Sequence, residues 1–205
     1  MNNYYAYLLR DLMERNQIVS VYSDAEHPED FVVGRIEQVD SEHFLMCEFM
    51  PWGEIEGYRV RRIQDVFSVL YGEEYEERIR LMRTLSERRI RRVLPQDCSL
   101  EGGLLQAVLR VCQETQEIIT LEMGMEVFSG RVKEFNGLYL TMDLLDYFGN
   151  RDEEEVFELR DIGVVQLRSG EEWMYRRLEK WQASEAAALG KAENADENHD
   201  SDHIS

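Results

Sequence analysis

Residues 135–150 have the sequence FNGLYLTMDLLDYFGN and contain the clearest short-range structural signal in the chain. Asn136-Gly137 lies between two apolar-rich runs, which is typical of a tight hairpin whose central residues take positive φ. Gly149-Asn150 opens the next turn. Outward from this hairpin, alternating apolar residues predict five strands, over residues 118–122, 127–135, 138–145, 155–159 and 162–167.

The same pattern occurs earlier in the chain. With a shift of 96 positions, residues 31–71 align with residues 127–167 without a gap. Gly34 aligns with Gly130 inside a predicted strand, where glycine indicates a bulge or a sharp bend. Apolar residues at i, i+3, i+4 and i+7 also predict an amphipathic helix before each set of strands. These are Tyr5, Leu8, Leu9 and Leu12 in the first helix, and Leu105, Val108, Leu109 and Cys112 in the second. We therefore predict an internal duplication.

This duplication divides the chain into four parts. Residues 1–72 and 102–182 are the two copies of helix plus barrel, the second with a terminal helix. Residues 73–101 form an Arg-rich helical connector with a loop. Residues 183–205 are small, polar and acidic, and composition predicts disorder there.

A helix followed by five strands, with a glycine in the second strand, resembles the Sm and LSm family of small β-barrels. The sequence GRIEQVDSEHF places Asp40 six positions after Gly34, and GRVKEFNGLYL places Asn136 six after Gly130, as in the first motif of that family. The resemblance implies a mainly β fold with helices (α+β): two tandem five-stranded Sm-like or SH3-like barrels joined by an Arg-rich helix. Other SH3-type barrels or a PRC-like barrel remain alternatives.

The residues that bind RNA in Sm proteins are only partly present. The position of the family's RNA-contacting asparagine holds Phe44 in one copy and Leu140 in the other. Arg160 matches the arginine of the second motif, but Asp161 replaces the glycine that follows it. The resemblance therefore supports the fold more than RNA binding.

Composition limits the function classes. The chain has 42 acidic and 23 basic residues and a net charge of −19, which opposes non-specific attraction to phosphate or anionic lipid. Cys47, Cys98 and Cys112 lack the spacing of metal ligands and indicate free thiols. The chain begins without the features of a signal peptide. We expect a cytoplasmic protein without metal or cofactor.

The connector carries the main candidate binding residues. Its arginines suit phosphate or carboxylate groups, and with two residues outside it they form the candidate set for a partner protein or RNA: Arg78, Arg83, Arg88, Arg89, Arg91, Arg92, Arg160 and Trp181. Alternatively, the connector docks on the protein itself, with Ile79, Met82 and Leu85 turned inward.

The sequence contains no nucleophile elbow, phosphate loop, HExxH or dinucleotide fingerprint, so we predict no catalytic residue. The expected function is a non-enzymatic scaffold or regulatory module that binds protein partners, or another copy of itself, through exposed strand edges. Residues 58–63 or 164–167 are the edges expected to be free. The alternative is an Sm-like RNA-binding protein that uses the connector.

Overall fold

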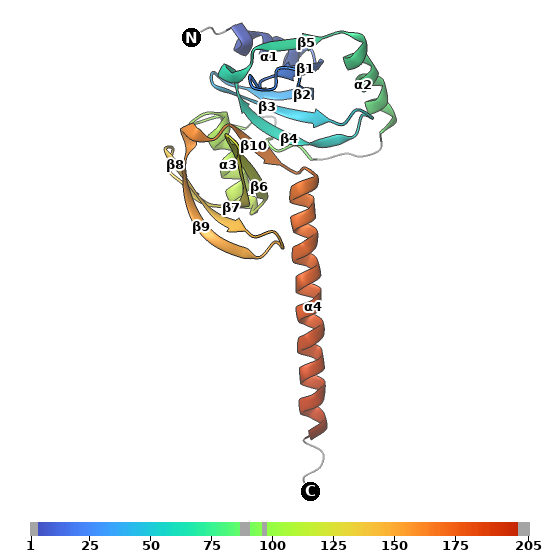
Figure 1. Cartoon of the computed structure of the whole chain (residues 1–205), viewed down its shortest axis with the longest axis vertical. Helices are drawn as coiled ribbons and strands as arrows, with labels where there is room; N and C mark the ends of the chain where they lie inside the picture. The colour runs from blue at the N-terminus through green and yellow to red at the C-terminus, as the bar shows by residue number, and fades with distance from the viewer. Residues whose placement is uncertain (1–3, 87–90, 96–97, 201–205) are drawn as a thin grey trace.

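The structure, a computed structural model, describes residues 4–86, 91–95 and 98–200, with side chains described up to residue 185. The chain contains two successive sets of elements, each with a helix, five strands and a second helix, and with a short 3-10 helix before the fifth strand (Figure 1). The first set comprises α1 (Tyr4–Glu14), β1 (Ile18–Tyr22), β2 (Val32–Val39), β3 (His43–Phe49), β4 (Ile55–Arg62), the 3-10 helix η1 (Ile63–Asp65), β5 (Ser68–Tyr71) and α2 (Glu74–Leu85). The second comprises α3 (Leu104–Thr115), β6 (Ile118–Met123), β7 (Glu126–Phe135), β8 (Tyr139–Leu145), β9 (Arg151–Glu158), η2 (Leu159–Asp161), β10 (Val164–Leu167) and α4 (Gly170–Asp200).

The ten strands form one open antiparallel sheet in the order β5-β1-β2-β3-β4-β10-β6-β7-β8-β9. The prediction of two closed five-stranded barrels is therefore wrong, and so is the prediction of a tandem repeat of small barrels. The physical reason is the pairing of β4. This strand lies beside β10 of the other half, so it joins the two halves into one sheet instead of closing the first half into a barrel. Each half still arranges its five strands in the same order.

The two motif glycines allow strands to approach closely. A Cβ on Gly34 would collide with the carbonyl oxygen of Cys47 on β3, and one on Gly130 would collide with that of Asp143 on β8. A bulge follows two residues later in both strands, between Ile36 and Gln38 in β2 and at the matching place in β7. These features bend the strands of each half (Figure 1).

The turns after these strands depend on side-chain hydrogen bonds. Asn136 Oδ1 accepts hydrogen bonds from the backbone N–H groups of Leu138 and Tyr139, at 3.1 and 3.0 Å. Asp40 Oδ1 accepts equivalent bonds from Glu42 and His43 at 2.7 and 2.6 Å. The motif residues Asp40 and Asn136 thus stabilise turns, as short polar side chains commonly do.

The apolar core runs through the junction between the halves. One cluster includes Tyr58 on β4 and Leu167 on β10, together with α3 residues such as Leu109. A second, smaller cluster lies between α1 and the first strands, around Leu9 and Phe44. Because the larger cluster draws on both halves, they share one folded body.

Helix α4 extends away from the sheet (Figure 1). Its 31 residues correspond to about 46 Å of helix. It continues from Gly170 to Asp200, whereas composition favoured disorder from residue 183. None of the described helices combines the length and the apolar character that crossing a lipid bilayer requires.

Candidate functional site

The junction between the halves is an antiparallel strand pair with a buried ionic centre. Arg59 on β4 lies opposite Gln166 on β10, and its Nε donates a hydrogen bond to Gln166 Oε1 at 2.8 Å. The Glu48 carboxylate, 1% exposed, forms ion pairs with Arg59 and with Arg61, the latter at 3.2 Å. Burial lowers the pKa of both arginines. The Glu48 carboxylate between them offsets part of this cost within the first half. The hydrogen bond from Arg59 to Gln166 connects this ionic centre to β10.

This junction corrects the prediction about free edges. Either residues 58–63 or residues 164–167 were expected to offer an open edge, but β4 and β10 pair with each other from Tyr58 to Arg61 and from Val164 to Leu167. The end strands of the sheet are β5 and β9. The candidate interaction edges therefore lie on the strands for which sequence analysis gave no such role.

The β5 edge is apolar. No described strand pairs with its outer side, and Phe67, Leu70 and Tyr71 expose 42%, 44% and 45% of their surface there. Aromatic rings with centroid distances of 5.2 to 6.2 Å lie beside it: Tyr22, Phe31, Phe67 and Tyr75. An open apolar edge is a ready template for pairing with another chain, because its N–H and C=O groups are unpaired.

The β9 edge is acidic. Four consecutive carboxylates occupy it, from Asp152 to Glu155. Glu154 pairs with Lys133, but Asp152, Glu153 and Glu155 form no ion pair with any residue that the structure describes. Adjacent like charges discourage pairing between identical edges, so this edge differs in chemistry from the β5 edge.

A groove of about 890 Å³ lies between the turns of the two halves. Asp40 and Arg62 line it, together with apolar residues such as Leu105. Asp40 also accepts a hydrogen bond at 2.6 Å from the N–H of Leu104, at the start of α3, and Arg62 is paired with Asp65 at 2.8 Å. Both charged groups therefore have partners within the protein.

His43 also lines the groove. Burial lowers its pKa below the usual value, so the imidazole is neutral at physiological pH. In the described part of the chain, no group of three or more His, Cys, Asp or Glu residues is arranged to hold a metal ion.

Two buried glutamates were missed by sequence analysis. Glu76 and Glu172 are 3% and 1% exposed, and they occupy the same place near the start of α2 and α4. Thr120 Oγ1 donates a hydrogen bond to Glu172 Oε1 at 2.6 Å, and Ser20 donates to Glu76 in the same way. Each glutamate also accepts a hydrogen bond from a backbone N–H at the helix start. The sequence signal was the capping-box spacing from Ser169 to Glu172.

The connector arginines form no single basic patch among the described residues. Arg78 is exposed on α2, whereas the guanidinium of Arg83 lies over the Phe49 ring, 5.9 Å from its centroid. Arg88 and Arg89 lie outside the described residues. Within α2, Ile79 is fully buried as expected, but Leu85 is 76% exposed, so the expectation that it turns inward is wrong.

Residues 91–94 of the connector contact the rest of the protein. Arg92 Nε lies 3.1 Å from Glu37 Oε2 on β2. Arg168 Nη1 donates hydrogen bonds to the backbone carbonyls of Arg91 and Arg92. The next two residues, Val93 and Leu94, are buried. This segment therefore packs on the sheet.

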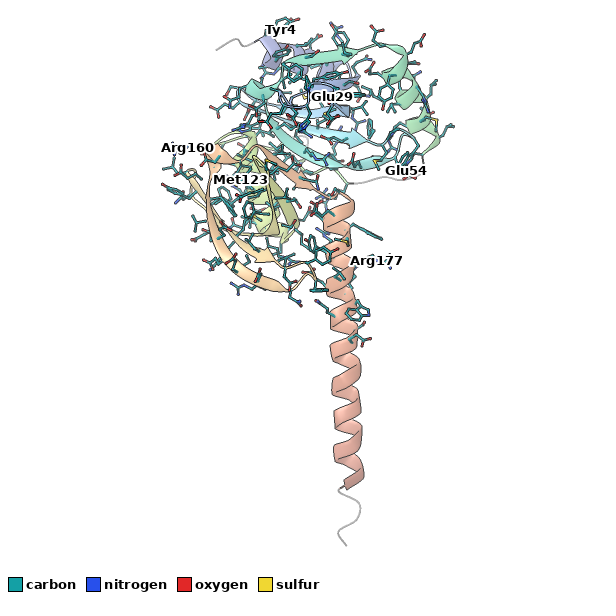
Figure 2. The ribbon with its side chains drawn as sticks, viewed as in Figure 1. Tyr4, Glu29, Glu54, Met123, Arg160 and Arg177 are labelled. Atoms are coloured by element: carbon teal, nitrogen blue, oxygen red, sulfur yellow. The ribbon has the colours of Figure 1, made fainter. Side chains whose placement is uncertain are left out.

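Arg160 and Trp181 lie apart from the connector. Arg160, on η2, is 80% exposed and pairs with Glu158 at 2.6 Å. Trp181 is 60% exposed on α4, the helix that also carries Arg177, on the opposite side of the molecule from Arg160 (Figure 2). The positions of the Sm asparagine, Phe44 and Leu140, are fully buried.

A comparison of the chain with models of known protein families, with curated proteins and with solved structures found no match in any of the three.

Proposed function

We propose that the protein is a non-enzymatic interaction module that binds partner proteins by adding their strands to the open ends of its sheet. The β5 edge carries this proposal, because it combines unpaired backbone groups with the exposed side chains of Phe67, Leu70 and Tyr71. In strand addition, backbone hydrogen bonds supply affinity and the alternate side chains supply specificity.

The surroundings of β5 suit such binding. The aromatic cluster with Tyr22 and Phe31 gives an incoming apolar side chain a contact surface next to the backbone edge. The strand is firmly anchored on its inner side, where Val69 lies opposite Val21 of β1. A rigid edge pays little ordering entropy when a partner binds.

The proposal gives the protein no catalytic residue and places it in the cytoplasm. The free state of Cys47, Cys98 and Cys112 fits a reducing compartment. RNA binding through the connector stays a separate prediction. The Glu37 ion pair of Arg92 favours a structural role for that end of the connector.

Site-specific photo-crosslinking in the native cells tests the proposal. A photoreactive residue at Leu70 is compared with one at Leu138, a 71% exposed leucine on the β7–β8 turn in the other half of the sheet. We expect protein adducts of discrete mass from position 70 only. A Tyr71→Lys change should remove them, since an edge lysine resists strand pairing. Equal adduct patterns at both positions, in folded protein, contradict the proposal.

A further inference from the structure

We propose that β9 accepts an extended segment of a basic partner protein whose four pairing residues are apolar, apolar, basic and basic. The inference rests on the proposed function, strand addition, and it names the partner chemistry at the second edge. It follows from the junction inside the molecule, which shows how a strand is added to the corresponding position of the first half.

The β4–β10 junction indicates the register in which a partner strand would pair with β9. β10 pairs with β4 so that Val165 lies opposite Val60 and Gln166 lies opposite Arg59. β9 occupies in its half the place that β4 occupies in the other, at the end of the same strand order. With the shift of 96 positions, Val60 corresponds to Val156 and Arg59 to Glu155. A strand added to β9 in the same register therefore pairs with Phe157, Val156, Glu155 and Glu154, in that order.

The side chains of β9 specify what each partner residue must be. Phe157 is buried and packs on Phe128 with a centroid distance of 4.8 Å, and Val156 is 59% exposed. Apolar residues opposite these two positions would bury apolar surface. Glu155 and Glu154 follow, and directly opposite charges stabilise a strand pair whereas like charges destabilise it. The third partner residue is therefore lysine or arginine, opposite Glu155, which has no ion pair among the described residues. A basic fourth residue would add a second cation to Glu154, which already pairs with Lys133.

Among these β9 residues, Glu155 should distinguish most strongly between a basic partner residue and a neutral one. It is half-buried and forms no ion pair with any residue that the structure describes. At the junction, the corresponding Arg59 is neutralised by Glu48, but the position of Glu48 holds Leu144 in the second half. A strand that covers Glu155 without supplying a cation leaves a desolvated, unpaired carboxylate, which is costly.

The same reasoning disfavours a second copy of this chain as the occupant. In the register of the junction, the open strand β5 of a copy would place Leu70 opposite Glu155 and Tyr71 opposite Glu154. Neither residue is a cation. The net charge of −19 further opposes the approach of a copy and favours a basic partner.

Fluorescence anisotropy on the full chain tests this inference. The probe is a labelled peptide with the core Val-Val-Arg-Arg, compared with Arg-Arg-Val-Val of the same composition, which places valine opposite both glutamates, and with Val-Val-Glu-Glu. We expect saturable binding of the first peptide, at least about tenfold tighter than binding of either comparison peptide. Equal binding of the two arginine peptides would show non-specific attraction and overturn the inference.

Charge reversal locates the site. Glu155→Lys should weaken the Val-Val-Arg-Arg peptide at least about tenfold, and a Val-Val-Glu-Arg peptide should recover binding to this variant. Glu29→Lys, in an exposed loop far along the chain from β9, makes the same change in net charge and should leave binding unaltered. If both variants weaken binding equally, the inference fails. That failure leaves the crosslinking result at Leu70 on β5 unaffected, so the two proposals are tested separately.

Discussion

Arg59 Nε lies 2.8 Å from Gln166 Oε1, across the strand pair that joins the two halves of the sheet. The position that corresponds to Arg59 at the free end of the sheet is Glu155. At the paired edge, Arg59 has an ion pair with Glu48 and a hydrogen bond to the neutral amide of Gln166. At the open edge, Glu155 forms no ion pair with a described residue. The two edges therefore differ in charge as well as in pairing.

Replacing Glu48 should destabilise the protein strongly. Glu48→Gln removes the carboxylate that pairs with both Arg59 and Arg61, and breaking a buried ion pair costs about 3–5 kcal/mol. The remaining carboxylates near Arg59, those of Glu56 and Glu122, lie farther away, at 3.6 and 3.8 Å. Chemical denaturation measures the free energy of unfolding. Glu153→Gln, an exposed edge residue without an ion pair among the described residues, should change it by less than about 0.5 kcal/mol. Similar losses in both variants would contradict the role assigned to Glu48.

The hydroxyl groups that donate hydrogen bonds to the buried glutamates should also contribute to the stability of the protein. Thr120→Val removes the donor to Glu172, and Ser20→Ala removes the donor to Glu76. Ser20→Ala should cost about 1–3 kcal/mol, because the buried Glu76 Oε1 loses its hydrogen-bond donor. Thr120→Val should cost about 1 kcal/mol, because Glu172 Oε1 keeps a hydrogen bond from Gln166. Thr115→Val is the control, since Thr115 is exposed and its hydroxyl bonds only to a carbonyl of its own helix. Thermal melts that do not separate Thr120→Val from this control would refute the prediction.

Adding a methyl group at the motif glycines should disrupt the bend. In Gly34→Ala and Gly130→Ala the new Cβ meets a backbone carbonyl of the neighbouring strand, which cannot move without breaking the sheet. We expect each variant to lose more than about 2 kcal/mol or to fail to fold. Gly170→Ala, whose Cβ meets no heavy atom within 4 Å, should be neutral or slightly stabilising. Wild-type stability of Gly34→Ala would show that the close approach is absent.

Thiol reactivity should distinguish the cysteines. Burial raises the pKa of Cys47 from 9.0 to about 11, so the native thiol stays protonated and unreactive at pH 8. Iodoacetamide should therefore modify the half-exposed Cys98 well before Cys47, as followed by peptide mass spectrometry. Equal labelling rates in folded protein would contradict this burial.

The raised pKa of Cys47 also makes the free energy of unfolding depend on pH. Between pH 9.0 and about 11 the unfolded chain releases the Cys47 proton while the native state keeps it. The unfolded state then binds fewer protons, so the contribution of Cys47 is fully present below pH 9.0 and is lost as the pH rises. A Cys47→Ala variant should show a weaker decline in the free energy of unfolding over this interval.

Local structure was more predictable than strand pairing. The periodicity of Leu8, Leu9 and Leu12 predicted α1, and the hairpin at Asn136-Gly137 was found where expected. Its type was not, because Gly137 has positive φ but Asn136 does not, and the turn depends on the Asn136 side chain instead. Such hydrogen bonds compete with the turn type that residue preferences favour.

The pairing of β4 with β10 could not be predicted from local pattern. Periodicity identifies each strand but not its neighbour, and the junction brings together residues far apart in the sequence, such as Arg59 and Gln166, which are 107 residues apart. The candidate sites depend on the same choice, because it leaves β5 and β9 as the end strands. The arginine-rich composition of the connector predicted that it binds a partner. In the structure, Arg92 pairs with Glu37 of the protein itself.

Hydrogen–deuterium exchange of the full chain, with and without saturating Val-Val-Arg-Arg peptide, tests strand addition to an open edge most directly. Backbone amides of residues 151–158 should exchange more slowly when the peptide is bound, since edge N–H groups gain partners. Amides of residues 58–61, already in the strand pair with β10, should be unchanged. Protection confined to other segments, with bound peptide and no change at residues 151–158, would contradict strand addition at β9.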